Sequence, residues 1–500
     1  MKKLTIYFTS DTHGYLYNTD FFDASEKPMG LYGMRFPKDG DTLIIDGGDT
    51  IQGSPLTYYC HEKGLPCPAA AAMNDRGYDY VTLGNHDFNY GQSWLRAHLN
   101  TLNARCLCAN VQDEQGQLPI APYAVQTLAS GLRVGLFGIV TDWVNRWEQP
   151  EHLQGLQITS PLEAACKAVE ALKKEGVDLV IGIYHGGLER DPGSGALLSD
   201  TDENIACRLC EELPIDLLLT GHQHIGMANQ QWHGTHIVQT PCNATRYIRV
   251  QWDEQNGFLS ELIAVPAQQR LTAEQQALRK ALDHFLDTPI GKLSEPLWPG
   301  EKLDMALNGS PIADFFNRVQ LWASGADISC AALANEVRGF DSAVTVRDVV
   351  ASYPYANTLV VLEITGEQLK TALEQCARYF DVAEDGTVGV SDTFLKPKAA
   401  HYNYDYFTGI RYTIDLNRPA GNRVTAIERA GRTVGPTERL TLCMCNYRAT
   451  GFGHFEVYLQ CERLREIQTE ISELILNYLK AHPRIEIPKE APYRVIMPKI

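Results

Sequence analysis

Five short polar motifs constrain what this chain can fold into, because each one follows a run of apolar, β-prone residues. In chain order they read D-T-H, G-D, G-N-H-D, H-G-G and G-H-Q-H, and the runs are residues 4–8, 42–45, 80–83, 179–184 and 215–219. Buried strands of an α/β sheet deliver their loops to its carboxyl edge, where ligands bind. Five loops spread over more than two hundred residues are therefore expected to meet at one site.

The motifs carry side chains of the kinds that bind borderline divalent metals: imidazole, carboxylate and one amide carbonyl, without thiolate. These side chains are Asp11, His13, Asp49, Asn85, His185, His222 and His224. Two metal ions about 3.5–4 Å apart can hold a hydroxide between them and clamp a phosphoryl group. The sequence thus predicts hydrolysis of a phosphoester at a dinuclear centre, with Mn²⁺, Zn²⁺, Co²⁺ or Fe²⁺ as candidate ions.

The metal-binding side chains divide into two predicted ligand sets that share one carboxylate. One set is Asp11, His13, Asp49 and His224, and the other is Asp49, Asn85, His185 and His222. Asp49 is assigned as the bridge, because a carboxylate has two oxygens to share whereas an imidazole offers one nitrogen per metal. His86, beside Asn85, is placed to stabilise the phosphoryl oxygens or to protonate the leaving oxygen.

Each motif taken singly has a simpler interpretation. A lone histidine after an apolar strand is more often a packed or surface residue than a ligand, and G-D or G-H alone is common. The fixed order of the five motifs, each at the end of an apolar run, favours a joint site over coincidence.

Length and composition limit the partners. Five hundred residues suggest two to four domains, and 44% hydrophobic with 21% charged residues are typical of a soluble globular protein. The net charge of −17 argues against a nucleic-acid polymer, while a small phosphorylated substrate stays compatible. No apolar run reaches the roughly 18–20 residues of a membrane span, so no membrane partner is expected. The oligomeric state cannot be read from the sequence.

The N-terminus and the cysteines favour a cytoplasmic location. The apolar run at residues 4–8 is too short for the core of a signal peptide and leads directly into Asp11. The 13 cysteines are dispersed without zinc-site spacing, so they are interpreted as reduced thiols.

Local signals suggest the domain organisation. Ser160, Pro161 and Glu163 predict a helix start, and the strand that follows this helix is typical of an α/β layer. An amphipathic helix is predicted at 271–286, and the polar motifs have ended before it. The predicted domains are a metal domain at 1–266, a helical linker or hinge at 267–295 and a C-terminal domain at 296–500.

Residues 1–265 resemble the calcineurin-like metallophosphoesterases, a family defined by D-x-H, G-D, G-N-H-D/E, H and G-H-x-H in that order. All five blocks are intact, which implies an active enzyme. Residues 296–490 resemble the C-terminal domain of the 5′-nucleotidase family, through segments 309–320, 355–359, 402–405 and 446–449. The resemblance implies an N-terminal α/β sandwich of two mixed sheets flanked by helices and a C-terminal α+β domain that binds the nucleoside.

Two aromatic stretches, at 401–407 and 446–455, support two interpretations. Aromatic residues on glycine-rich loops can stack a nucleobase, at about 1–3 kcal/mol per base, or they can be core residues of a β-rich domain. The family resemblance implies that two aromatics sandwich the base, here Tyr404 (or Tyr402) and Phe455. It also places Asn335 and Arg338 near the family's asparagine–glycine–arginine loop, as further substrate-binding candidates.

Asn89 bears on the substrate. Many 5′-nucleotidases of this family have an aspartate three residues after the histidine that matches His86, and here that residue is Asn89. An asparagine can orient the histidine but cannot stabilise its cationic form as a carboxylate would. His86 and Asn89 are assigned as the catalytic pair. Asn89, together with the segments at 402–405 and 446–449, resembles the 2′,3′-cyclic-nucleotide 2′-phosphodiesterase/3′-nucleotidase branch.

The expected function is therefore metal-dependent hydrolysis of 2′,3′-cyclic nucleotides, 3′-nucleotides or both, with domain motion about the linker as a gate for turnover. A 5′-nucleotidase or UDP-sugar hydrolase is the alternative. A nuclease and a non-catalytic binding protein are further hypotheses, disfavoured respectively by the acidic charge and by the intact ligands.

Overall fold

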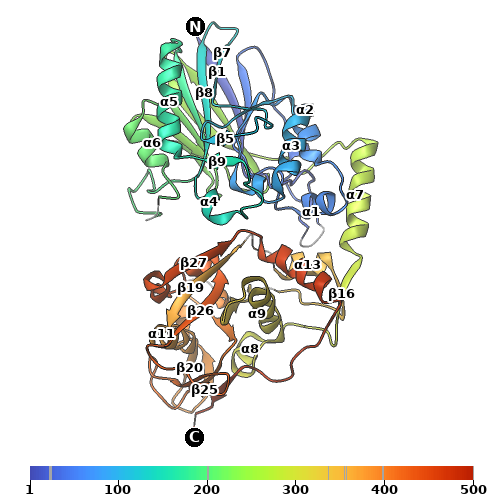
Figure 1. Ribbon diagram of the computed structural model, residues 1–500, viewed down its shortest axis with the longest axis vertical. Coiled ribbons are helices and arrows are strands. Elements are labelled where there is room, and N and C mark those ends of the chain that lie inside the picture. Colours follow the sequence, from blue (N-terminus) through green and yellow to red (C-terminus); the bar gives the residue numbers. More distant parts are fainter. Residues whose placement is uncertain are drawn as a thin grey trace. The chain divides into compact units, whose positions relative to one another are not determined.

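The computed structural model describes residues 1–21, 25–199, 202–335, 337–353, 355, 357–396 and 399–498. They form two compact units, and the main division of the chain falls between Leu282 and Asp283 (Figure 1). Helix α7 (Ala273–Leu286) runs through this division, inside the segment predicted as the linker. The predicted boundaries at 266 and 295 stay predictions. Among the described residues, no helix has both the length and the apolar character that crossing a membrane requires.

The first unit contains two mixed sheets, each with parallel strands at its centre. One has the order β15-β14-β1-β2-β3-β4-β6, and the other β12-β13-β11-β10-β8-β7. The strands of the first sheet are β1 (Lys3–Thr9), β2 (Thr42–Asp46), β3 (Tyr80–Val81), β4 (Arg105–Leu107), β6 (Ile120–Ala121), β14 (Arg246–Asp253) and β15 (Gly257–Ala264). Those of the second are β7 (Tyr123–Thr127), β8 (Arg133–Val140), β10 (Leu179–His185), β11 (Leu217–Thr220), β12 (Met227–Trp232) and β13 (Thr235–Gln239). A small pair joins β5 (Val111–Asp113) and β9 (Leu156–Ile158).

The two sheets pack face to face over one apolar core. Ile6 and Ile45 from the first sheet lie in the same buried cluster as Leu136, Ile181 and Leu219 from the second. The other face of the second sheet is covered by helices α5 (Pro161–Lys174) and α6 (Ala206–Glu212), which share a second buried cluster with it (Figure 1). The remaining helices of this unit are α1 (Pro55–Glu62), α2 (Pro68–Arg76), α3 (Gly91–Thr101) and α4 (Val144–Trp147). This arrangement confirms the predicted α/β sandwich.

Helix α5 begins where the sequence predicted. The Ser160 side chain accepts a hydrogen bond from the Glu163 backbone N–H and caps the helix.

The direction of the strands explains why the motifs share an edge. Strands β1 and β2 are parallel neighbours, and so are β10 and β11. Strands that run in one direction end at one edge of their sheet, so the loops that follow them lie together.

The second unit is α+β, as predicted. Its main sheet has the order β22-β17-β26-β19-β27, and smaller sheets have the orders β25-β24-β23-β29, β18-β16-β28 and β20-β21. The helices are α8 (Lys302–Asn308), α9 (Pro311–Ser324), α10 (Val346–Ser352), α11 (Gly366–Ala377), α12 (Asn446–Ala449) and α13 (Ile471–Ala481). The strands are β16 (Pro289–Leu293), β17 (Ile328–Ala332), β18 (Ala343–Thr345), β19 (Leu359–Thr365), β20 (Phe380–Val382), β21 (Val388–Val390), β22 (Asp405–Thr408), β23 (Arg411–Asp415), β24 (Val424–Arg429), β25 (Arg432–Thr433), β26 (Arg439–Cys445), β27 (Glu462–Ile467), β28 (Arg484–Ile485) and β29 (Tyr493–Ile496).

Candidate metal centre

The loops at the strand ends bring the motif side chains of the first unit into two clusters. The first cluster consists of Asp11, His13 and His224, and the second of Asp49, His185 and His222. In each, one ligand atom per residue lies within 4.8 Å of the others. The two clusters are thus candidate sites for two metal ions, as expected of a dinuclear centre.

Short distances define the first cluster. The Nε2 atoms of His13 and His224 are 3.2 Å apart, and His224 Nε2 is 3.3 Å from Asp11 Oδ1. The Asp11 and His13 side chains are buried, while His224 is 30% exposed at its side chain. The cluster therefore opens to one side through His224.

The second cluster also includes the amide of Asn85. Asp49 Oδ2 lies 3.1 Å from His185 Nε2, and Asn85 Oδ1 lies 3.2 Å from the same nitrogen and 2.9 Å from His222 Nδ1. The structure thus brings together all the side chains predicted as ligands of this set. The bridging role of Asp49 stays a prediction, although its backbone carbonyl accepts a hydrogen bond from the His13 N–H of the first cluster.

Hydrogen bonds on the far side of the His13 and His185 rings determine which ring nitrogen faces each cluster. His13 Nδ1 donates to the Gln52 carbonyl at 3.0 Å, and His185 Nδ1 donates to the Gly47 carbonyl at 2.7 Å. A carbonyl only accepts, so each Nδ1 carries a hydrogen, and in its neutral form each ring presents a bare Nε2 to the cluster. Asp11 Oδ2 and Asp49 Oδ2 are buried without a hydrogen-bond partner. Converging acceptors without donors fit a bound cation.

The pKa values agree with this interpretation. Burial lowers the pKa of His13 to about 4, so its ring is neutral and available as a ligand near pH 7. Burial also acts to lower the pKa of His185, but the Asp49 carboxylate outweighs it and raises that pKa to about 9. In the absence of a cation a proton therefore takes its place beside Asp49, and metal and proton compete there.

Most of the ligand-bearing residues have left-handed backbone conformations that favour glycine. The φ angles are 54° for Asp11, 49° for His13, 55° for Asp49, 72° for His222 and 60° for His224. Each such residue costs on the order of 1–3 kcal/mol and persists only where the surroundings hold it. Backbone hydrogen bonds from Asp11 N to Gly48 O and from His13 N to Asp49 O supply that support. These backbone conformations lower the stability of the fold and direct the ligand side chains into the two clusters.

Two buried carboxylates that sequence reasoning missed hold these loops. Asp87 accepts from the backbone N–H groups of Asp49, Thr50, Ile51 and Gly84 at 2.8–3.1 Å. Asp46 accepts from Thr9 Oγ1 at 2.6 Å, Thr50 Oγ1 at 2.8 Å and the Gly48 N–H at 3.0 Å. Asp87 belongs to the G-N-H-D motif, so its fixed place there was the available signal.

Glu203 is a further missed residue. Its carboxylate accepts from His222 Nε2 at 2.8 Å, which directs His222 Nδ1 toward Asn85. The Trp147 ring stacks on His222 with 5.6 Å between ring centroids. Carboxylates behind a ligating histidine fix its tautomer and orientation. No motif marks Glu203 in the sequence, because the contact spans nineteen residues and depends on the fold.

His86 and Asn89 lie beside the clusters. His86 Nδ1 donates to Asn89 Oδ1 at 2.7 Å, and the His86 backbone N–H donates to Asp49 Oδ1 at 2.7 Å. The rings of His86 and His13 are 5.4 Å apart between centroids. The structure therefore places this pair at the centre, and its catalytic role stays a prediction.

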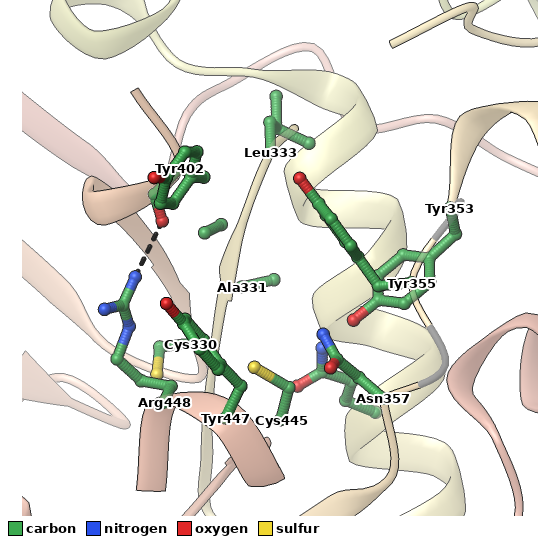
Figure 2. Close-up of a pocket in the computed structure, with 12 residues that line it drawn as sticks. Cys330, Ala331, Leu333, Tyr353, Tyr355, Asn357, Tyr402, Cys445, Tyr447 and Arg448 are labelled. Atoms are coloured by element: carbon green, nitrogen blue, oxygen red, sulfur yellow. Dashed lines mark hydrogen bonds between the residues drawn. The ribbon is translucent and has the colours of Figure 1, made fainter. Parts of the chain in front are cut away.

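The second unit contains a pocket of about 390 Å³ among aromatic side chains. Figure 2 shows the rings of Tyr355, Tyr402 and Tyr447 around it, with Cys330 and Cys445 at its wall. Tyr355 and Tyr447 are 42% and 40% exposed, so their ring faces are accessible. Tyr402 is one of the predicted base-binding residues. Tyr447 lies in the aromatic stretch at 446–455, but it is not among the residues predicted to bind the base.

A buried ion pair supports this pocket. Arg448 pairs with Asp405 at 2.9 Å, and both side chains are almost fully buried. Arg448 also donates to the Tyr402 carbonyl at 2.7 Å (Figure 2) and lies over the Phe455 ring. Arg448 on α12 thus connects to β22 through the ion pair and to the segment before it through the Tyr402 carbonyl, which fixes Tyr402 at the pocket.

Tyr404 and Phe455 do not line the pocket, which corrects the prediction for both. Tyr404 is 2% exposed and packs against the rings of Tyr379 and Tyr406, while its hydroxyl donates to Ala306 O. Phe455 is fully buried and stacks on Tyr458. Neither ring has a free face for a base. For these two rings, the alternative of core residues is the one that the structure supports.

Asn335 and Arg338 lie at a different cavity, which they line together with Lys302. Asn335 donates to Ala399 O and accepts from the His401 N–H. Arg338 lies 3.5 Å from Asp348. The structure therefore does not bring these two candidates to the aromatic pocket, and their role in substrate binding stays a prediction. Glu336, between them, lies outside the described residues.

Comparisons with known proteins match both parts of the chain to known families. The calcineurin-like phosphoesterase family matches residues 4–226, and the 5′-nucleotidase C-terminal domain matches residues 289–460. A Staphylococcus aureus structure assigned to the 5′-nucleotidases is 34% identical, with a TM-score of 0.74 and 99% of each chain covered.

Relatives of known activity are similar to this chain over most of its length. The 2′,3′-cyclic-nucleotide 2′-phosphodiesterase/3′-nucleotidase of Haemophilus influenzae is 25% identical over 96% of this chain and 84% of its own length. The trifunctional nucleotide phosphoesterase YfkN of Bacillus subtilis is 23% identical over 95% of this chain, which spans only 38% of that relative. With the paired clusters and the two matched domains, the chain belongs to the calcineurin-like metallophosphoesterases that carry a 5′-nucleotidase C-terminal domain.

Proposed function

We propose that this metal-dependent phosphoesterase hydrolyses 2′,3′-cyclic nucleotides and 3′-nucleotides. The paired clusters carry the proposal, because their converging acceptors fit two cations. Asn89 at the position of the family's aspartate and the similarity to the Haemophilus influenzae relative support this substrate class.

In this proposal, seven residues hold the two cations and His86 acts on the phosphoryl group. Asp11, His13 and His224 would hold one divalent cation, and Asp49, Asn85, His185 and His222 the other, with Mn²⁺, Zn²⁺, Co²⁺ or Fe²⁺ as candidates. When bound, two such cations acidify water and screen charge on phosphoryl oxygens. His86, whose Nδ1 faces Asn89 Oδ1, is positioned in its protonated form to donate from Nε2 a hydrogen bond to a phosphoryl oxygen or a proton to the leaving oxygen.

The aromatic pocket supplies base recognition in this proposal. A purine or pyrimidine ring is flat and stacks on tyrosine, which contributes about 1–3 kcal/mol per base. Tyr355, Tyr402 and Tyr447 present rings at the pocket wall, and Asn357 offers an amide for hydrogen bonds. Stacking is tolerant of base identity, so broad base use is expected.

A 5′-nucleotidase is the second candidate, favoured by the Staphylococcus aureus structure at 34% identity. The two candidates share the metal centre and differ in which phosphoester reaches it. A panel of substrates therefore separates them.

The test is turnover by Mn²⁺-loaded protein on 2′,3′-cyclic, 3′- and 5′-nucleotides, a UDP-sugar and supercoiled plasmid. We expect the cyclic and 3′-nucleotides to give the highest kcat/KM and the plasmid to stay intact. Highest kcat/KM on 5′-nucleotides would replace the proposal with the second candidate, and nicking of the plasmid would replace it with a nuclease.

A variant pair ties turnover to the clusters. Asp49→Ala is expected to lower kcat/KM by at least about a thousandfold, because it removes a ligand and leaves His185 unmatched. Asp75→Ala, which removes an exposed carboxylate on α2, should keep wild-type kcat/KM. Full activity in Asp49→Ala would show that the measured turnover comes from another protein.

A further inference from the structure

Glu148, the residue that follows α4, is a buried carboxylate beside the catalytic pair. Its side chain is 4% exposed. Oε1 accepts from the Gln149 N–H at 2.7 Å and from His152 Nδ1 at 2.8 Å, and Oε2 accepts from Asn89 Nδ2 at 2.7 Å. One oxygen is thus held by two donors while the other is directed at Asn89.

The hydrogen bonds from Glu148 to His86 have only one consistent direction. A carboxylate can only accept, so Asn89 must turn its Nδ2 toward Glu148. The Asn89 Oδ1 then faces His86 Nδ1, and because this oxygen also only accepts, Nδ1 must carry a hydrogen. Nε2 is left as the ring nitrogen that can meet a substrate. Because Nδ1 already donates to Asn89, the ring can also hold a proton on Nε2 and donate from it.

An asparagine without Glu148 would not fix the ring. The two ends of an amide have nearly the same shape, so Asn89 could turn and present its NH₂ group to His86. That orientation would make Nδ1 an acceptor, so the ring could hold a hydrogen on Nε2 only as the neutral tautomer, which releases a proton far less readily than the protonated ring. An aspartate at this position has no donor end and would need no lock.

We propose that Glu148 is a positioning residue that locks the Asn89 amide and, through it, the tautomer and orientation of the His86 ring. The inference rests on the proposed function, in which His86 acts on the phosphoryl group. It explains how this chain keeps a directed histidine with asparagine at residue 89. It also assigns α4 two roles at the centre, since Trp147 of the same helix stacks on His222.

Kinetics of Glu148→Gln test the lock. Glutamine has nearly the same shape but offers both donor and acceptor ends, so Asn89 is free to turn. We expect kcat to fall about ten- to a hundredfold while KM stays within twofold, since ground-state binding is not touched. Glu151→Gln makes the same change at an exposed carboxylate three residues away and should keep wild-type kcat.

Rescue distinguishes positioning from a structural role. In Glu148→Gln/Asn89→Asp, the new carboxylate at residue 89 accepts from His86 Nδ1 without help, so kcat should return to within about threefold of wild type. If the double variant folds with the wild-type melting temperature but keeps the low kcat of Glu148→Gln, the lock is wrong. Unchanged kcat in Glu148→Gln would also overturn it.

A spectroscopic readout tests the lock without turnover. Nitrogen-15 NMR of histidine-labelled protein, assigned with His86→Ala, reports which ring nitrogen carries the hydrogen. The wild type should show the hydrogen on Nδ1, and Glu148→Gln should show a mixture of the two tautomers. The same tautomer in both proteins would overturn the inference, even if the substrate panel had already replaced the proposed function.

Discussion

The metal loops of the first unit and the aromatic stretches of the second follow opposite rules. In the loops, residue type is decisive: carboxylate, amide and imidazole groups converge, and the backbone accepts left-handed conformations at Asp11, Asp49 and His222 to aim them. In the aromatic stretches, residue type decides little. Tyr402 lines a pocket, whereas Tyr404, two residues on, is buried in the core. A ligand is defined by its chemistry, but the role of a tyrosine is defined by what covers its faces.

The sharpest test of this difference is the pair Tyr402→Ala and Tyr404→Ala. Removing the buried Tyr404 ring should lower the free energy of unfolding by about 3–5 kcal/mol, since a cavity replaces a packed aromatic. Tyr402→Ala should cost far less, because this ring is only partly covered. Urea denaturation measures both. An equal decrease in the free energy of unfolding for both variants would contradict the assignment of Tyr404 to the core and Tyr402 to the pocket.

A second test concerns the support of the metal loops. Burial raises the pKa of Asp46 to about 7, from an ordinary value of 3.8. The folded state thus binds a proton that the unfolded state has released, so stability falls as pH rises from about 4 to about 7, by up to about 1.4 kcal/mol per pH unit. Asp46→Asn should remove this fall in metal-free protein. Parallel stability curves for the two proteins between pH 4 and 7 would contradict it.

A third test separates base recognition from chemistry. Tyr447→Ala removes a ring that is 40% exposed at the pocket wall, so KM should rise about ten- to a hundredfold with kcat little changed. Trp322→Ala, at a 45% exposed ring that packs on Tyr478 and His482 rather than on pocket residues, is the matched control. A larger effect from Trp322 would place the base elsewhere.

The last test concerns Glu203, the carboxylate that holds the candidate ligand His222 from behind. Glu203→Gln should weaken metal binding at the Asp49, His185 and His222 cluster by about ten- to a hundredfold, because His222 loses its carboxylate partner. The Asp11, His13 and His224 cluster should keep its affinity. Calorimetric titration of metal-free protein resolves the two sites. Equal weakening of both would show that Glu203 acts on the whole fold.

The sequence predicted the parts of the molecule that depend on local pattern and on chemistry. Apolar runs ending in polar motifs indicated the strands and the shared edge, and Ser160 marked the start of α5. The left-handed conformations could not be predicted, since glycine is the usual signal for them and aspartate and histidine, as at Asp11 and His224, adopt them only occasionally.

Long-range contacts explain the remaining misses. Glu148 and Glu203 reach the centre from loops that carry no motif, and each contact depends on how the strands are ordered. The aromatic predictions failed at Tyr404 and Phe455 because burial is decided by the packing of distant elements, such as Tyr379 over Tyr404.

The two clusters of the first unit are expected to hold two cations. Anomalous X-ray diffraction from crystals of the Mn²⁺-loaded protein measures this directly. Two anomalous peaks are expected, one at each cluster, about 3.5–4 Å apart. Crystals of catalytically active, Mn²⁺-loaded protein with no peak at either cluster would contradict it.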